Sequence, residues 1–263
     1  MNTFELKHEI INFVREYPEK KQTVTRWQEP LVAFAAADDP LFSQLKQVVS
    51  PTHALPTDFV ADAQTVIAYF IPFDREINLS NGEFEYSSEA WARAYIETNR
   101  LIRDLNGYVQ EQLKQRGYAS SNLPATHNFD EKTLVSDWSH KHIGYIAGLG
   151  KFGLHQMLIT DRGCSGRLGS IVTNLKLEPT SRSDQENCLY RKNGTCGRCV
   201  RQCPNGALTF ETYNRHRCYE RCLDNADRFS TLGLADVCGK CLANVPCAFI
   251  NPVKREGENH GLV

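Results

Sequence analysis

The chain has 263 residues, of which 41% are hydrophobic and 23% are charged, and its formal net charge is −1. This length supports one large domain plus a small one, and no run approaches the roughly 20 apolar residues of a membrane helix. The chain begins MNTFELKHEI, without an apolar signal segment or a twin-arginine leader. We therefore expect a cytoplasmic protein that does not engage a membrane.

Residues 1 to about 125 alternate between helical and strand-like patterns. Helices are expected where apolar residues recur at helical spacing, and strands where short apolar runs are bounded by polar residues or proline. The predicted elements are a helix over 4–17 that ends before Pro18, a strand over 31–35, a short helix over 40–49, a strand over 65–71, and a long helix over 88–115 that Ser88 opens and Gly117 stops. Such alternation predicts a layered α/β or α+β domain.

The part of the chain that follows, up to residue 180, is punctuated by glycine. Its predicted elements are a helix over 138–150 that Asp137 can cap, and strands over 155–160 and 169–177 joined by a turn over 161–169. A polar linker over 181–187 leads into a cysteine-rich segment. We expect an α+β protein with an N-terminal layered α/β domain over 1–180 and a C-terminal module over 181–263.

Nine of the ten cysteines lie between Cys188 and Cys247. Two cubane iron–sulfur clusters need eight thiolates, and in two-cluster ferredoxins the cysteine before proline ligates the other cluster. On that logic one [4Fe–4S] cluster takes Cys188, Cys196, Cys199 and Cys247, and the other takes Cys203, Cys218, Cys238 and Cys241. The spacing therefore predicts a ferredoxin-like module that handles electrons.

Zinc binding and disulfide formation are the alternatives for these cysteines. A zinc site could use the C-x2-C pairs, but it would leave five cysteines and the Cys203-Pro204 pair without a role. A disulfide framework would need an oxidising compartment, which the N-terminus does not indicate. Cys222 is the ninth, unligated thiol in the iron–sulfur hypothesis, although it could replace Cys218 as a ligand.

The charge is distributed unevenly along the chain. From Asn187 onward eleven Lys and Arg residues face seven Asp and Glu residues, a balance of +4 against −5 for the preceding part. A basic segment often indicates nucleic-acid binding. Two cubane clusters of about −2 each would offset this excess, so we do not expect nucleic acid to be a partner.

Glycines are concentrated just ahead of the cysteine module. The string Gly148-x-Gly150-x-x-Gly153 matches the dinucleotide-binding fingerprint, which requires a strand before it and a helix after it. Here a helix is predicted first and a strand second, so a Rossmann site is not expected. Two interpretations of the glycines stay open: tight turns between packed elements, or a flat cofactor lying against bare backbone.

A few further side chains are candidates for chemistry. His140 and His142 are two residues apart, so on a helix they face different directions and cannot bind one metal together. Each histidine is expected first as a surface or packing residue, and His140 and Tyr145 are candidate proton donors. Asp137 is a helix cap first and a candidate acid second. Cys164 is either a small turn residue or a reactive thiol that faces a cofactor.

Several segments together resemble the epoxyqueuosine reductase family, a wider group that includes the catalytic part of reductive dehalogenases. The resemblance covers residues 137–250 and is carried by SHKHIGYIAGLGKFG, LIT, GRLGSIVTNLKLEP, CGRCVRQCPNGAL and CGKCLANVPC. The cysteine motif alone is shared with many ferredoxins, whereas the glycine-rich segments ahead of it are more specific.

The resemblance implies two [4Fe–4S] clusters and a base-off cobalamin in an N-terminal domain related to nitroreductase folds. Electrons would pass from an external low-potential donor, of the ferredoxin or flavodoxin type, through the clusters to the corrinoid and a small-molecule or cofactor substrate. By match to the family motif, the corrinoid would lie near Ala147, Gly148, Gly150, Phe152, Gly153, Arg167, Gly169 and Ser170.

The chain also departs from the family pattern. Leu134 stands where the epoxyqueuosine enzymes have the aspartate proposed as general acid, with Asp130, Glu131 and Asp137 only nearby. The C-terminal helical extension for tRNA has no counterpart, which suggests a short paralogue with another substrate. We expect an iron–sulfur oxidoreductase. The alternatives are a non-catalytic ferredoxin-type electron carrier and an epoxyqueuosine (tRNA) reductase.

Overall fold

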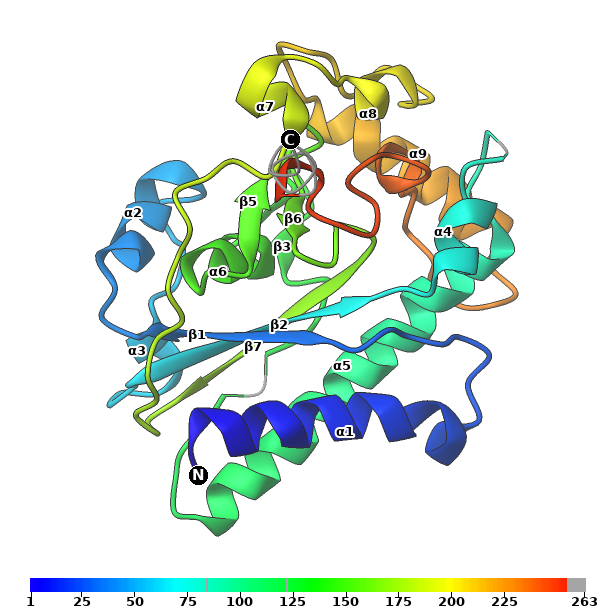
Figure 1. The fold of residues 1–263 in the computed structure, drawn as a ribbon. Coiled ribbons are helices and arrows are strands. Elements are labelled where there is room, and N and C mark those ends of the chain that lie inside the picture. The colour runs from blue at the N-terminus through cyan, green and yellow to red at the C-terminus, as the bar shows by residue number, and fades with distance from the viewer. Residues whose placement is uncertain (84, 122, 255–263) are drawn as a thin grey trace, which may run out of the picture.

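A three-stranded antiparallel sheet forms the centre of the computed structural model, which describes residues 1–83, 85–121 and 123–254. The strands lie in the order β1 (Leu31–Ala36), β2 (Thr65–Pro72) and β7 (Gly166–Thr173), as Figure 1 shows. Every residue of the middle strand β2 is buried. Both faces of the sheet must therefore be covered.

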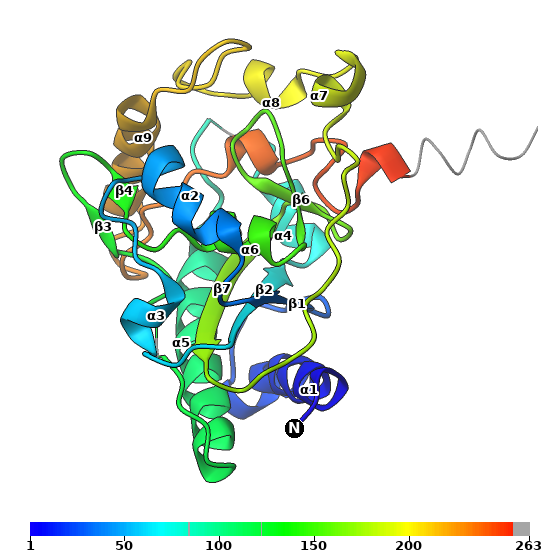
Figure 2. The ribbon, with the colours of Figure 1, turned by 90° about the vertical axis from the view of Figure 1, so that its left-hand side faces the viewer.

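Helices cover the two faces. α1 (Thr3–Lys21) and α5 (Glu89–Gln115) lie on one face, and α2 (Pro40–Val48) and α6 (His140–Ile146) lie on the other (Figures 1 and 2). Successive residues of β2 point to opposite sides: Ile67 joins the core under α1 and α5, and Val66 joins the core under α2 and α6.

The long helix α5 is confirmed as predicted. The hydroxyl of Ser88 accepts a hydrogen bond from the backbone N–H of Trp91, and Gly117 follows the helix with a positive φ of 81°. The apolar stripe that the spacing predicts is buried along its whole length, at Trp91, Ala94, Tyr95, Ile102, Leu105, Val109 and Leu113.

Several boundaries differ from the prediction. The helix predicted over 138–150 is shorter, since α6 spans His140–Ile146 and Gly148 beyond it has a φ of +85°. The strand predicted over 155–160 begins only at Leu158, and the one predicted over 169–177 ends at Thr173. α1 does not end before Pro18 but continues to Lys21. Proline inside a helix removes one backbone hydrogen bond. Here Tyr17 and Pro18 are both buried, and the Tyr17 hydroxyl donates to Asp104 of α5 at 2.9 Å, so tertiary contacts hold the last turn in place. β7 begins at Gly166, three residues before the predicted start, because its pairing with β2 extends to Pro72.

The remaining elements are short. They are α3 (Pro56–Phe59), α4 (Arg75–Ser80), β3 (Phe129–Asp130), β4 (Val135–Ser136), β5 (Gly150–Phe152), β6 (Leu158–Thr160), α7 (Leu189–Asn193), α8 (Arg198–Arg201), α9 (Arg215–Arg228) and a 3-10 helix (Lys240–Leu242). Since α6 precedes β5, the helix-then-strand order around the Gly148–Gly153 string is confirmed. Among the described residues, no helix combines the length and apolar character needed to cross a membrane.

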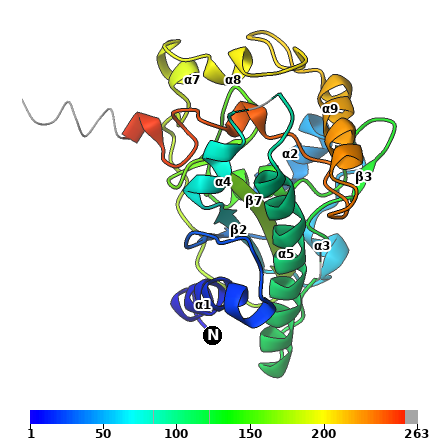
Figure 3. The ribbon, with the colours of Figure 1, turned by 90° about the vertical axis from the view of Figure 1, so that its right-hand side faces the viewer.

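The cysteine-rich segment packs against α4 and the start of α5 (Figure 3). Asn78 is fully buried and donates to the backbone oxygen of Leu242 at 2.9 Å, while Asn81 donates to that of Cys238 at 3.0 Å. Phe73 and Trp91 share a third core with Leu242 and several cysteines. The mixed helix-and-sheet class is thus as expected. The nitroreductase-like layout and the boundary at residue 180 stay predictions.

Candidate functional site

Four cysteines line one cavity, which lies near α7 and α8 at one end of the molecule. These are Cys188, Cys196, Cys199 and Cys247, here called the first cysteine cavity. Cys188 immediately precedes α7, Cys199 lies within α8, and Cys247 comes from the C-terminal part of the chain. The first cysteine cavity therefore joins two segments that lie far apart in sequence.

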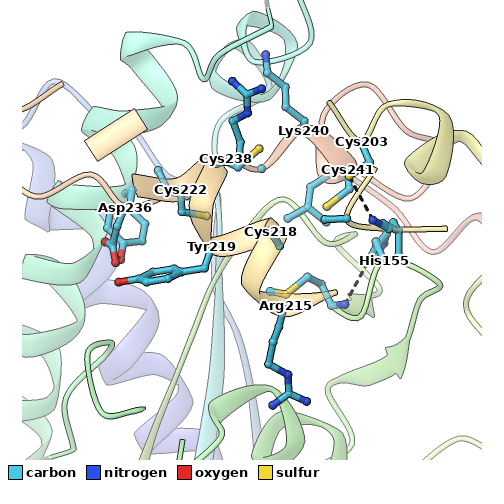
Figure 4. Close-up of a pocket in the computed structure, with 18 of the residues that line it drawn as sticks. His155, Cys203, Arg215, Cys218, Tyr219, Cys222, Asp236, Cys238, Lys240 and Cys241 are labelled. Atoms are coloured by element: carbon cyan, nitrogen blue, oxygen red, sulfur yellow. Dashed lines mark hydrogen bonds between the residues drawn. The ribbon is translucent and has the colours of Figure 1, made fainter. Parts of the chain in front are cut away.

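The other five module cysteines line a neighbouring cavity of about 450 Å³ (Figure 4). They are Cys203, Cys218, Cys222, Cys238 and Cys241, here called the second cysteine cavity. Cys203 follows α8, so the chain passes from the first cavity at Cys199 to the second within four residues. Cys218 and Cys222 are one helical turn apart on α9 and both face the cavity.

These two groups match the sets of thiols that the spacing predicts for two clusters, with Cys222 as the additional member. Burial raises the pKa of Cys199 to about 12 and that of Cys238 to about 11, because a thiolate loses water inside the protein. Neighbouring cysteines raise both pKa values further. In these two residues a bound metal ion would offset the cost of the thiolate form. Cluster binding by these residues stays a prediction.

Cys164 precedes the other nine cysteines in the sequence but lies beside one of them in the fold. Its Sγ lies 3.9 Å from Sγ of Cys247, and its backbone N–H donates to the Cys247 oxygen at 2.9 Å. A third residue, His155 from the segment between β5 and β6, lies beside these two cysteines. Its Nε2 is 3.5 Å from Sγ of Cys247. His155 was not a candidate from the sequence, where no motif singles it out.

A larger cavity of about 770 Å³ lies beside the second cysteine cavity and is here called the adjoining cavity. α2, α6 and β5 line it, together with the turn that contains Leu134. Four residues line both this cavity and the second cysteine cavity: Phe129, Leu134, Tyr213 and Arg215. Leu134, which stands where the epoxyqueuosine enzymes have an aspartate, therefore lines both cavities.

The three predicted catalytic residues occupy different environments. Asp137 does not cap α6, whose N-cap is Ser139; its exposed carboxylate accepts a hydrogen bond from the Thr52 hydroxyl at 2.6 Å instead. Asp137 also lines neither the second cysteine cavity nor the adjoining cavity. Tyr145 lines the adjoining cavity. The catalytic roles of all three residues stay predictions.

His140, the third of these residues, has both ring nitrogens engaged within the protein. Nε2–H donates to the backbone oxygen of Pro124 at 2.8 Å, which leaves Nδ1 to accept from the Ser170 hydroxyl at 2.9 Å. Ser170 in turn accepts from the indole N–H of Trp138 at 2.9 Å. Burial lowers the pKa of His140 to about 4, so the ring is neutral at pH 7. This network ties α6 to β7.

The free energy of unfolding is expected to fall as the pH drops from about 6.5 toward 4. In this window the unfolded chain protonates His140 while the folded protein does not, so unfolding takes up protons. The contribution of His140 to the slope is at most about 1.4 kcal/mol per pH unit, and less because the side chain is partly exposed. Burial also lowers the pKa of His142, to about 4, so His142 contributes in the same pH window. Urea unfolding at pH 7 and pH 5 measures the slope. His140→Gln should make the profile flatter than that of the wild type; identical profiles in the two proteins would contradict the assignment.

The glycines ahead of the cysteine module are accounted for by close packing of the chain against itself. A Cβ at Gly150 would lie 2.2 Å from the backbone oxygen of Ile159, and one at Gly169 would lie 2.4 Å from the Tyr69 ring. Of the residues predicted to contact a corrinoid, Phe152 lines the adjoining cavity and Arg167 the second cysteine cavity. The others, Ala147, Gly148, Gly150, Gly153, Gly169 and Ser170, line neither, and their role toward a cofactor stays a prediction.

A carboxylate absent from the sequence-based candidates lies in the second cysteine cavity. The side chain of Asp236 is only 5% exposed and accepts from the Tyr95 hydroxyl at 2.7 Å and from Nε2 of His127 at 3.0 Å. The Arg167 guanidinium lies 4.3 Å from the centre of the Tyr95 ring. These residues come from distant parts of the chain, so no local motif could indicate them.

Comparisons with known proteins identify relatives of one kind. A 109-residue segment, 40% of this chain, is 30% identical to an epoxyqueuosine reductase of Francisella cf. novicida (strain Fx1) and spans 29% of that protein. The chain is similar to the epoxyqueuosine reductases, as its motifs predict. No family model matches it.

Solved structures share the fold. An epoxyqueuosine reductase in complex with an epoxyqueuosine-modified tRNA stem loop aligns with a TM-score of 0.54 at 17% identity, covering 94% of this chain and 64% of that one. A catabolic reductive dehalogenase aligns with a TM-score of 0.54 at 18% identity, covering 87% of this chain and 31% of that one. The first structure contains a tRNA stem loop, and the expectation that nucleic acid is not a partner of this chain stays a prediction.

Proposed function

We propose that this protein is an iron–sulfur oxidoreductase that passes electrons through two [4Fe–4S] clusters to a cofactor or substrate bound in its N-terminal part. The observation that carries the proposal is the grouping of nine cysteines around two neighbouring cavities, four around one and five around the other. Four thiolates around one space are the donor set of a cubane cluster. An external low-potential ferredoxin or flavodoxin would supply the electrons.

The arrangement of the cavities supports a direction for electron flow. The adjoining cavity shares four lining residues with the second cysteine cavity and none with the first. A cluster held by the second set would therefore be the inner one, next to the acceptor, and a cluster held by the first set would be the outer one.

The adjoining cavity has the size and lining of a cofactor site. Its volume of about 770 Å³ lies within the range typical of such pockets. Tyr145 and Phe152 provide aromatic surface, and four basic residues face a single acidic one: Lys141, Lys151, Arg191 and Arg215 against Glu186. This lining suits a flat cofactor with anionic groups. Cobalamin, which the family resemblance implies, would supply a strongly reducing metal centre there.

A proton is also required when electrons convert a substrate to a neutral product. Asp236 and Tyr95 form a hydrogen-bonded pair that lines the second cysteine cavity, and burial raises the pKa of Tyr95 so that its hydroxyl keeps its proton. We assign the proton-holding role to this pair, since Leu134 cannot donate a proton.

One anaerobic experiment tests the proposal: purification followed by determination of iron, sulfide, zinc and cobalt, with visible spectra before and after cobalamin is added. About eight iron and eight sulfide per chain and a base-off cobalamin spectrum are expected. Zinc in place of iron would contradict the proposal. Full iron without any cobalamin uptake would favour a ferredoxin-type electron carrier.

Epoxyqueuosine reduction is the second candidate, and the similarity to the Francisella enzyme favours it. The leucine at position 134 weighs against it, because opening an epoxide to an alkene with loss of water needs an acid. Queuosine in the tRNA of a deletion strain decides between the two. An unchanged level would exclude this activity, and accumulation of epoxyqueuosine would establish it.

A further inference from the structure

His155 lies where the two cysteine cavities meet. It is one of the residues that line the first cavity and also one of those that line the second, and it is only 4% exposed. The ring therefore has almost no contact with solvent. Its polar atoms must find partners within the protein.

The partners of the two ring nitrogens define where the proton lies. The backbone N–H of Met157 donates to Nδ1 of His155 at 3.1 Å, so Nδ1 carries no proton. In a neutral imidazole the proton is then on Nε2. Nε2 lies 3.5 Å from Sγ of Cys247, so the ring donates an N–H···S hydrogen bond to that sulfur.

The backbone between β5 and β6 holds the His155 ring in this position. Between β5 and β6 it makes a tight turn in which Gly153 N–H donates to the Met157 oxygen at 2.9 Å and Gln156 N–H donates to the Gly153 oxygen at 3.0 Å. A Cβ at Gly153 would lie 2.7 Å from Cε1 of His155. The glycine at this position leaves room for the ring.

We propose that His155 is a positioning residue that donates a hydrogen bond to the Cys247 ligand and thereby raises the reduction potential of the first cluster above what it would otherwise be. The inference rests on the proposed function, because it assumes that Cys247 ligates a cluster. Reduction adds one electron to the cluster without making or breaking a bond. The added negative charge resides partly on sulfur, so a donor to sulfur stabilises the reduced form more than the oxidised form.

The test is an anaerobic redox titration with dithionite, followed by electron paramagnetic resonance of both clusters, in the wild type, His155→Leu and His155→Gln. Leucine removes the donor, and glutamine keeps an N–H. We expect His155→Leu to shift the oxidised-to-reduced equilibrium of one cluster by about tenfold, which is 59 mV for one electron, toward lower potential. The other cluster should shift far less, the iron content should stay at the wild-type value, and His155→Gln should recover most of the shift.

The outcomes separate this inference from the proposed function. If the wild type holds two clusters and His155→Leu has the same reduction potentials as the wild type, the inference is overturned and the proposed function is not. Equal shifts of both clusters, or an equal shift in the leucine and glutamine variants, would indicate a merely structural effect and would also overturn it. A wild-type protein that binds no iron under reconstitution would overturn both.

Discussion

The Cys199→Ala variant is expected to retain about half of the wild-type iron, roughly four atoms of eight. Cys199 is one of the four cysteines that line the first cysteine cavity, and it does not line the second. A cubane cluster with only three cysteine ligands is bound weakly and is lost, whereas the second cluster keeps all four of its cysteine ligands. Iron and sulfide determination after anaerobic purification measures the effect.

Cys164→Ala is the matched control, because it removes a buried thiol from the same region. Cys164 contacts Cys247 but does not line the first cysteine cavity, so the iron content should stay at the wild-type value. Equal iron loss from the two variants would show that Cys164 is a ligand and that the predicted partition of the thiols is wrong. Complete loss from Cys199→Ala would show that the two clusters do not bind independently.

The Gly163→Ala variant is expected to be destabilised and to lose iron from the first cluster. Gly163 has a φ of +77°, and a Cβ there would lie 2.3 Å from the backbone oxygen of Ala248. The left-handed conformation alone costs about 1 kcal/mol for alanine. The collision adds about 2 kcal/mol or displaces the segment that carries Cys247.

Gly117→Ala provides the control for the conformational part of this effect. Gly117 has a φ of +81°, but a Cβ there would meet no atom within 4 Å. We expect about 1 kcal/mol of destabilisation and unchanged iron for this variant. Urea unfolding and iron content measured on both variants separate strain from collision. If both behave alike, the contact between residues 163 and 248 does not support the first cysteine cavity.

Local signals predicted most of the regular structure because they depend on neighbouring residues. Apolar spacing and the Ser88 cap place α5, and β1 and β2 follow from short apolar runs. The predictions were wrong where contacts between residues far apart in the sequence determine the local structure. α1 passes through Pro18 because Tyr17 bonds to α5, and Asp137 bonds to Thr52 instead of capping α6.

The sequence indicated the surroundings of the candidate site unevenly for the same reason, and the roles of the site residues stay predictions. Cysteine spacing is a local pattern, and the two predicted sets do share cavities in the folded chain. The glycines were ambiguous in sequence, since a missing Cβ leaves room equally for a cofactor or for another part of the protein. Only the structure shows that backbone and side chains of this chain fill that room.

The sequence by itself predicted the class of chemistry, because nine cysteines at these spacings offer enough thiols for two iron–sulfur clusters. Tertiary structure decided what surrounds that donor set: His155 and Cys164 beside Cys247, and Asp236 beside Tyr95. Each of these contacts joins residues that are more than 80 positions apart. Such pairs form through the docking of whole segments, which depends on packing across the molecule and leaves no local pattern in the chain.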